Sequence, residues 1–139
     1  MNEQQKITNN FYVLVGSNIE PAENIKKGLN LIEQENKISL IKQSSDYQSK
    51  AVGMEGDDFI NKVINCSTGM NFRETLDYLK NIEQRCGRVR EENKFISRTL
   101  DLDIIDWNNH EGVIEGYQLP DPDIKKYEFI SIPLSEIKE

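Results

Sequence analysis

The sequence has few of the residues on which metal clusters, disulfides and membrane spans depend. Its 139 residues include two cysteines and one histidine. Cys66 and Cys86 form no CxxC and no zinc-ligand spacing, so we interpret both as buried thiols. The single His110 excludes a histidine metal cluster. No run approaches the roughly 18 apolar residues of a membrane span, and the first ten residues lack a signal-peptide core. We therefore expect a cytoplasmic protein that does not bind membranes.

Positive charge is also scarce, and it is unevenly distributed. The net charge is −7 and the pI is about 4.8, which disfavours a nucleic-acid partner. The segment 80–98 nevertheless carries six cations against three anions. A basic patch on an acidic body suits a small polyanion. A solvated helix end followed by a charged loop explains this pattern equally well.

The common nucleotide-binding loops are missing. Gly16-Ser17-Asn18 follows a predicted strand but lacks the lysine of a P-loop, and no GxGxxG occurs. No GxSxG nucleophile elbow occurs either. A nucleotide would therefore have to be bound by other means.

The spacing of apolar residues predicts one α+β domain. Six segments show the period of a strand or a helix: strand 11–16, helix 21–35, strand 38–52, strand 59–70, helix 72–86 and strand 100–107. Asn71 and Glu74 predict a capping box at the second helix, and Gly87 predicts its end. Residues 1–10 are expected to be a flexible tail, and residues 11–139 a single domain. This order is typical of the ferredoxin-like fold, an antiparallel sheet with helices packed on it.

Two aspartates interrupt the last predicted strand. Asp101 and Asp103 alternate with Leu100, Leu102 and Ile104, so both carboxylates share one face of the strand. Such closely spaced carboxylates favour Mg²⁺, which combines one or two of them with substrate phosphates and water. The arginines just upstream could grip phosphate oxygens. The alternative is a solvent-facing strand that follows a charged loop.

Several short motifs together resemble one family, the 6-hydroxymethyl-7,8-dihydropterin pyrophosphokinases. The resemblance spans residues 11–137 and rests on these motifs: Gly16-Ser17-Asn18, Ser44-Ser45-x-Tyr47, Phe59-Ile60-Asn61, Ile82-Glu83, Gly87-Arg88-Val89-Arg90, Arg98-Thr99-Leu100-Asp101-Leu102-Asp103, Leu119-Pro120 and Phe129. It implies the ferredoxin-like fold and a diphosphokinase of folate biosynthesis. Such an enzyme transfers pyrophosphate from ATP to the hydroxymethyl group of the pterin and releases AMP.

The resemblance also implies roles for individual residues. Asp101 and Asp103 would bind two Mg²⁺ ions, and with Arg90 and Arg98 they would form the catalytic group. ATP, the co-substrate, would contact Glu83, Arg88, Arg90, Lys94, Arg98 and Ile104. The pterin would contact Ser49, Val52, Gly53, Phe59, Asn61 and Phe129.

Three positions depart from the family pattern and keep other functions open. Ser97 stands where a proline is usual, Asp121 where a histidine is usual, and Tyr127 where many members have an arginine. The last two changes make the nucleotide side more negative. One alternative is therefore a diverged pterin- or nucleotide-binding paralogue with weak or no catalysis. An RNA-binding module is disfavoured by the acidic charge and by the lack of an aromatic strand motif. We expect a monomer with small-molecule substrates.

Overall fold

The computed structural model describes residues 8–50, 57–87 and 100–138. Its elements, in chain order, are β1 (Asn9–Ser17), α1 (Pro21–Gln34), β2 (Ile38–Gln43), β3 (Tyr47–Ser49), β4 (Phe59–Thr68), α2 (Phe72–Arg85), β5 (Asp101–Trp107), β6 (Gly112–Ile114), β7 (Tyr117–Leu119), the 3₁₀ helix η2 (Pro122–Ile124) and α3 (Glu128–Ile137). Among these described residues, no helix is both long and apolar enough to cross a membrane.

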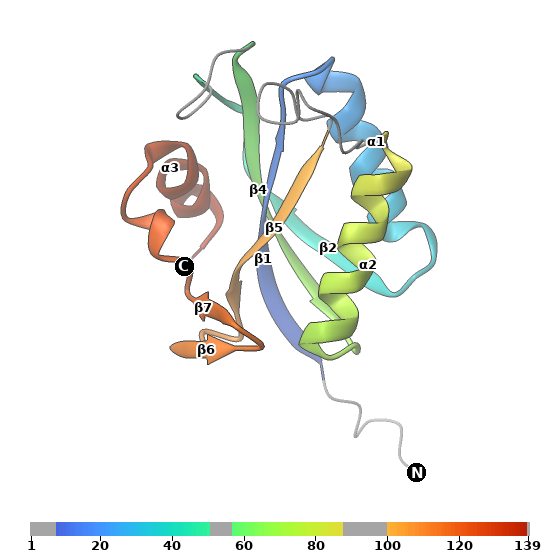
Figure 1. Ribbon diagram of the computed structural model, residues 1–139, viewed down its shortest axis with the longest axis vertical. Helices are drawn as coiled ribbons and strands as arrows, with labels where there is room; N and C mark the ends of the chain where they lie inside the picture. Colours follow the sequence, from blue (N-terminus) through green and yellow to red (C-terminus); the bar gives the residue numbers. More distant parts are fainter. Residues whose placement is uncertain (1–7, 51–56, 88–99, 139) are drawn as a thin grey trace.

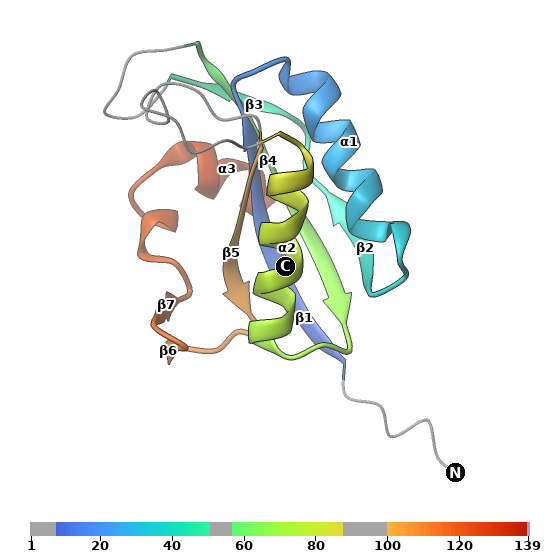
Figure 2. The same ribbon diagram turned by 45° about the vertical axis from the view of Figure 1, so that its right-hand side comes forward.

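A five-stranded antiparallel sheet forms the centre of the molecule. The strand order is β2-β4-β1-β5, and the short β3 pairs with the first three residues of β4. Helices α1 and α2 cover one face of the sheet, whereas α3 lies on the other face (Figures 1 and 2). The ferredoxin-like prediction is confirmed by this order of strands and helices. β1 is central, so its residues touch β4 and β5 together.

The larger core lies between the sheet and the helices α1 and α2. Phe11, Val13 and Val15 alternate along β1 toward this side and are fully buried. The predicted capping box is present: the Asn71 side chain accepts the Glu74 N–H at 2.8 Å, and Glu74 accepts the Asn71 N–H at 3.0 Å. Such a cap contributes about 1 kcal/mol to helix stability. It fixes where α2 begins on the sheet.

The two cysteines belong to this core. Cys66 and Cys86 are buried and unpaired, as predicted. Burial raises the pKa of the Cys66 thiol to about 12. Because the thiolate is the reactive form, Cys66 is a packing residue and not a nucleophile.

Two sequence predictions of secondary structure were inexact, and three elements were not predicted. β1 begins at Asn9, inside the expected tail, and the Asn9 amide donates to the Met70 carbonyl at 2.7 Å. The expected strand 38–52 is divided into β2 and β3, because Ser44 between them bonds with Val63 through both its backbone N–H and its hydroxyl. The hairpin β6–β7 and helix α3 were not predicted at all.

Helix α3 is held on the second face by apolar packing and by polar contacts near its C-terminus. Ile130, Leu134 and Ile137 pack on Val63 and Ile105 of the sheet. The Glu136 carboxylate accepts hydrogen bonds from the Ser45 N–H at 2.9 Å and the Ser45 hydroxyl at 2.8 Å, and Lys138 forms an ion pair with the buried Asp106. These contacts fix the C-terminal end of α3 over the sheet.

A bulge in β5 adjusts the strand to this helix. Val13 pairs with Ile104 and Tyr12 pairs with Asp106, which leaves Ile105 as the extra residue. The Ile105 carbonyl instead accepts the N–H of Asp121 at 2.9 Å. The bulge therefore connects β5 to the segment that precedes α3.

Candidate active site

A cavity of about 210 Å³ opens on the α3 side of the sheet. Its floor comes from β1 and β5, one wall comes from β3 and β4, and the opposite wall comes from η2 and the start of α3. It lies where β1 ends and β5 begins, since Gly16 pairs with both Asn61 of β4 and Asp101 of β5. Segments distant in sequence therefore meet at this one place.

The β5 side of the cavity is acidic. Asp101 is half-buried and Asp103 is exposed, and both line the cavity while Leu102 between them is buried in the opposite core. The alternation predicted from the sequence is therefore observed. Asp121 and Asp123 also line the cavity. Four carboxylates around one hollow favour the binding of cations.

The environment of Asp121 shows this concentration of negative charge. Burial raises the pKa of the Asp121 carboxyl, and the charges of Asp123 and Asp103 raise it further. The Asp123 N–H, which donates to Asp121 Oδ1 at 2.9 Å, acts in the opposite direction. A cation bound in the cavity would relieve this repulsion.

The β4 side of the cavity carries a buried, hydrogen-bonded asparagine. Asn61 is 4% exposed, and its side-chain NH₂ donates to the Ser49 hydroxyl at 2.8 Å and to the Tyr47 carbonyl at 3.3 Å. Its Oδ1 lies only 3.1 Å from where a Cβ would stand on Gly16. Glycine at this position therefore leaves room for the amide oxygen beside the cavity floor.

Two phenylalanines line the cavity from different elements. Phe59 comes from β4 and Phe129 from α3. The Phe129 ring stacks on Tyr127, with centroids 5.0 Å apart and an interplanar angle of 21°. The stack fixes the Phe129 ring at the rim of the cavity, and the pair of phenylalanines could contact a flat heterocycle.

The structure brings six of the predicted site residues together in this cavity, namely Ser49, Phe59, Asn61, Asp101, Asp103 and Phe129. Two others lie elsewhere. Ile104 is buried in the core under α1 and α2, and Glu83 is buried on α2, where it accepts the Leu102 N–H at 2.7 Å. The remaining predicted residues, Val52, Gly53, Arg88, Arg90, Lys94 and Arg98, are outside the described residues.

Sequence reasoning missed Asp123 and Lys80. Asp123 repeats at Asp121-Pro122-Asp123 the spacing of two carboxylates that marked the β5 pair, so the signal was present in the sequence. Lys80 reaches Asp103 at 3.5 Å from α2. The sequence around Lys80 and Asp103 does not predict their contact, because the contact depends on how α2 packs against β5.

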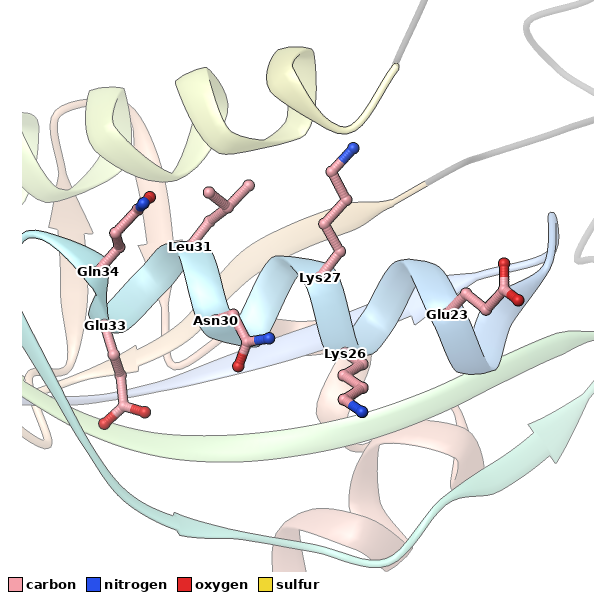
Figure 3. Close-up of a pocket in the computed structure, with 7 residues that line it drawn as sticks. All are labelled: Glu23, Lys26, Lys27, Asn30, Leu31, Glu33 and Gln34. Carbon is pink, nitrogen blue, oxygen red and sulfur yellow. The ribbon is translucent and has the colours of Figure 1, made fainter.

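A larger hollow of about 550 Å³ runs along the outer surface of α1 and is lined by residues of that helix alone. Figure 3 shows that Lys27 and Leu31 point toward one side of the helix, whereas Lys26 and Glu33 point toward the other. These side chains do not converge on a common point. We therefore take the smaller cavity beside Asp101 and Asp103 as the candidate active site.

Comparison with known proteins identifies the family of this chain. The model of the 7,8-dihydro-6-hydroxymethylpterin-pyrophosphokinase (HPPK) family matches residues 12–139. Three relatives are named 2-amino-4-hydroxy-6-hydroxymethyldihydropteridine pyrophosphokinase. The Haemophilus influenzae protein is 36% identical over 91% of this chain and 79% of its own length. The Bacillus subtilis protein is 32% identical over 94% and 79%, and the Synechocystis protein is 32% identical over 88% and 63%. The chain belongs to the HPPK family.

Proposed function

We propose that this chain is an ATP-dependent diphosphokinase of folate biosynthesis. It transfers the pyrophosphoryl group of ATP to the hydroxymethyl group of 6-hydroxymethyl-7,8-dihydropterin and releases AMP. Membership of the HPPK family supports this activity. The observation that carries it is that the carboxylates of Asp101 and Asp103 share one cavity with Asn61 and the two phenylalanines. A phosphate-binding end and a heterocycle-binding end therefore adjoin.

Asp101 and Asp103 would hold Mg²⁺. Their oxygens are hard donors that project from one face of β5, which fits this ion. Among the described residues, no three His, Cys, Asp or Glu side chains form a complete metal site. Substrate phosphates and water would supply the other ligands, and the resemblance implies two ions. When bound, Mg²⁺ neutralises the charge that develops on the transferred phosphates.

The other end of the cavity would bind the pterin. Asn61 is oriented by its contacts with Ser49 and Tyr47, and its Oδ1 can accept hydrogen bonds from N–H groups on the ring edge. Phe59 and Phe129 would contact the two faces of the ring. This end of the cavity would shield the ring from water and orient the hydroxymethyl group toward the carboxylates.

The nucleotide side of the proposal rests on sequence resemblance. Arg90 and Arg98 would hold the triphosphate, with Arg88 and Lys94 beside them and Val52 and Gly53 near the pterin. Glu83 and Ile104 would contribute to the nucleotide site from the α2 side of β5. We further propose that residues 11–139 form one domain that acts as a cytoplasmic monomer. Light scattering would test the monomer.

The direct test is incubation with ATP, Mg²⁺ and 6-hydroxymethyl-7,8-dihydropterin, with AMP and the pterin diphosphate separated by chromatography. We expect both products in equal amounts, and neither without Mg²⁺. The acidic Asp121 and the stacked Tyr127 favour one other function, a paralogue that binds without catalysis. Binding of the pterin without release of AMP would establish that function instead.

A further inference from the structure

Two side chains of α2 bind the backbone between the aspartates. Lys80 and Glu83 lie one turn apart near the end of α2. Glu83 Oε2 accepts the Leu102 N–H at 2.7 Å, and Lys80 Nζ donates to the Leu102 carbonyl at 3.2 Å. The ammonium also lies 3.2 Å from Glu83 Oε2 and 3.5 Å from Asp103 Oδ1. One lysine thus joins α2 to both the backbone and a carboxylate of the candidate site.

The position of Leu102 makes this contact relevant to the metal pair. Among the described residues, β5 pairs only with β1 and lies at the edge of the sheet. Asp101 and Asp103 pair with Gly16 and Leu14 of β1, whereas the N–H and C=O of Leu102 face away from β1. Lys80 and Glu83 bind these two groups in the way that a neighbouring strand would. They therefore fix the backbone that sets the spacing of the two carboxylates.

Lys80 and Glu83 differ in burial and in charge, and therefore in what each can do at this site. The Glu83 side chain is 4% exposed, so its carboxylate depends on the partners that it binds. The Lys80 side chain is 39% exposed and reaches around the strand edge toward the acidic cavity. Its contact is with Oδ1 of Asp103, which leaves the second carboxylate oxygen for a cation. Lys80 thereby restrains Asp103 without occupying the place of the metal.

We propose that Lys80 is a positioning residue that holds Asp103 in the orientation needed for metal-dependent transfer. This inference rests on the proposed function, because it takes Asp103 as a metal ligand. Groups that orient a metal ligand typically change activity by 10- to 100-fold when they are lost. The ammonium also repels a divalent cation, so its removal should strengthen metal binding while it slows turnover.

The experiment compares Lys80→Met, Lys80→Arg and the double variant Lys80→Met/Glu83→Gln with the unchanged protein. In the double variant, glutamine can still accept the Leu102 N–H, and no buried carboxylate loses its partner. Lys37→Met is the matched control, since Lys37 lies at the turn before β2 and its ion pair is with Glu35. The measurements are kcat and the KM for the pterin, together with binding of Mn²⁺ without nucleotide by electron paramagnetic resonance.

We expect kcat to fall roughly 10- to 100-fold in both Lys80→Met variants, with an unchanged KM for the pterin. Mn²⁺ should bind several-fold more tightly to Lys80→Met, whereas the double variant, which also loses the negative charge of Glu83, should change less. Lys80→Arg should restore kcat to within about threefold, because a guanidinium can bind the same two carboxylates. An unchanged kcat in the folded double variant would overturn the proposal.

Failure of the proposed function gives a different result. If the unchanged protein releases no AMP, the kinetic measurements lose their meaning but the Mn²⁺ titration does not. Tighter binding of Mn²⁺ by Lys80→Met than by the unchanged protein would still support the contact between Lys80 and Asp103. Equal binding by these two proteins would overturn it.

Discussion

The glycine on the floor of the cavity offers a sharp test of how the pterin end is built. A Cβ on Gly16 would lie 3.1 Å from Asn61 Oδ1 and 3.7 Å from Phe59 Cδ2. In Gly16→Ala the amide must move by a few tenths of an ångström, yet Ser49 holds its NH₂ group at 2.8 Å. Loss of one hydrogen bond to the ring costs about 0.5–1.5 kcal/mol. We therefore expect the KM for the pterin to rise roughly 2- to 13-fold.

The assay is the initial rate of AMP release as the pterin concentration is varied at saturating ATP. Gly28→Ala is the matched control, because its Cβ would lie 2.6 Å from Leu100 Cδ2 in the core on the opposite face. Each variant should lose about 1–3 kcal/mol of stability through overpacking, but only Gly16→Ala should change the KM for the pterin. A folded Gly16→Ala protein with an unchanged KM would refute the assignment of Asn61 to the pterin.

Three further outcomes are expected. Asp101→Asn and Asp103→Asn should each lower kcat by about two decades or more and leave the melting temperature nearly unchanged, since several kcal/mol of charge stabilisation are lost; near-normal turnover would reduce the pair to a surface feature. Burial raises the pKa of the Asp121 carboxyl, so its charged form destabilises the folded state at pH 7. Asp121→Asn should therefore raise the free energy of unfolding at pH 7. In urea titrations, this difference from the unchanged protein should disappear as the pH falls through the folded-state pKa toward 3.8. Hydrogen bonds from Ser45 lower the pKa of the Glu136 carboxyl. The stability that Glu136 contributes is therefore present above pH 4.5 and is lost as the pH falls through the lower folded-state pKa. Glu136→Gln should be less stable than the unchanged protein at neutral pH and equally stable in acid.

The local signals in the sequence predicted the sheet and the two helices on its first face. Asn71 and Glu74 fix the start of α2 by contacts three residues apart, and the alternation around Leu102 fixes which side chains of β5 face α3. Helix α3 was not predicted because its apolar residues surround Pro133, and proline is normally unfavourable inside a helix. Packing on Val63 and Ile105 outweighs that preference, and nothing in the local sequence shows it.

The candidate site could be predicted only in part. The spacing of Asp101 and Asp103 indicates a cation site without any other information. Phe59 and Phe129 look like ordinary core residues in the sequence, and only family resemblance and the fold bring them to one cavity. The contact between Lys80 and Asp103 depends on tertiary packing across an edge strand, so residue spacing carries no signal for it.

The attachment of α2 to the edge of β5 also bears on self-association. An edge strand presents unpaired backbone groups that a strand of another molecule can bind, which promotes aggregation. At Leu102 both groups are already occupied by Glu83 and Lys80. A foreign strand would have to displace a buried carboxylate before it could pair there. Solubility and the geometry of the aspartate pair thus depend on the same two side chains, and substitutions at either position are expected to affect both.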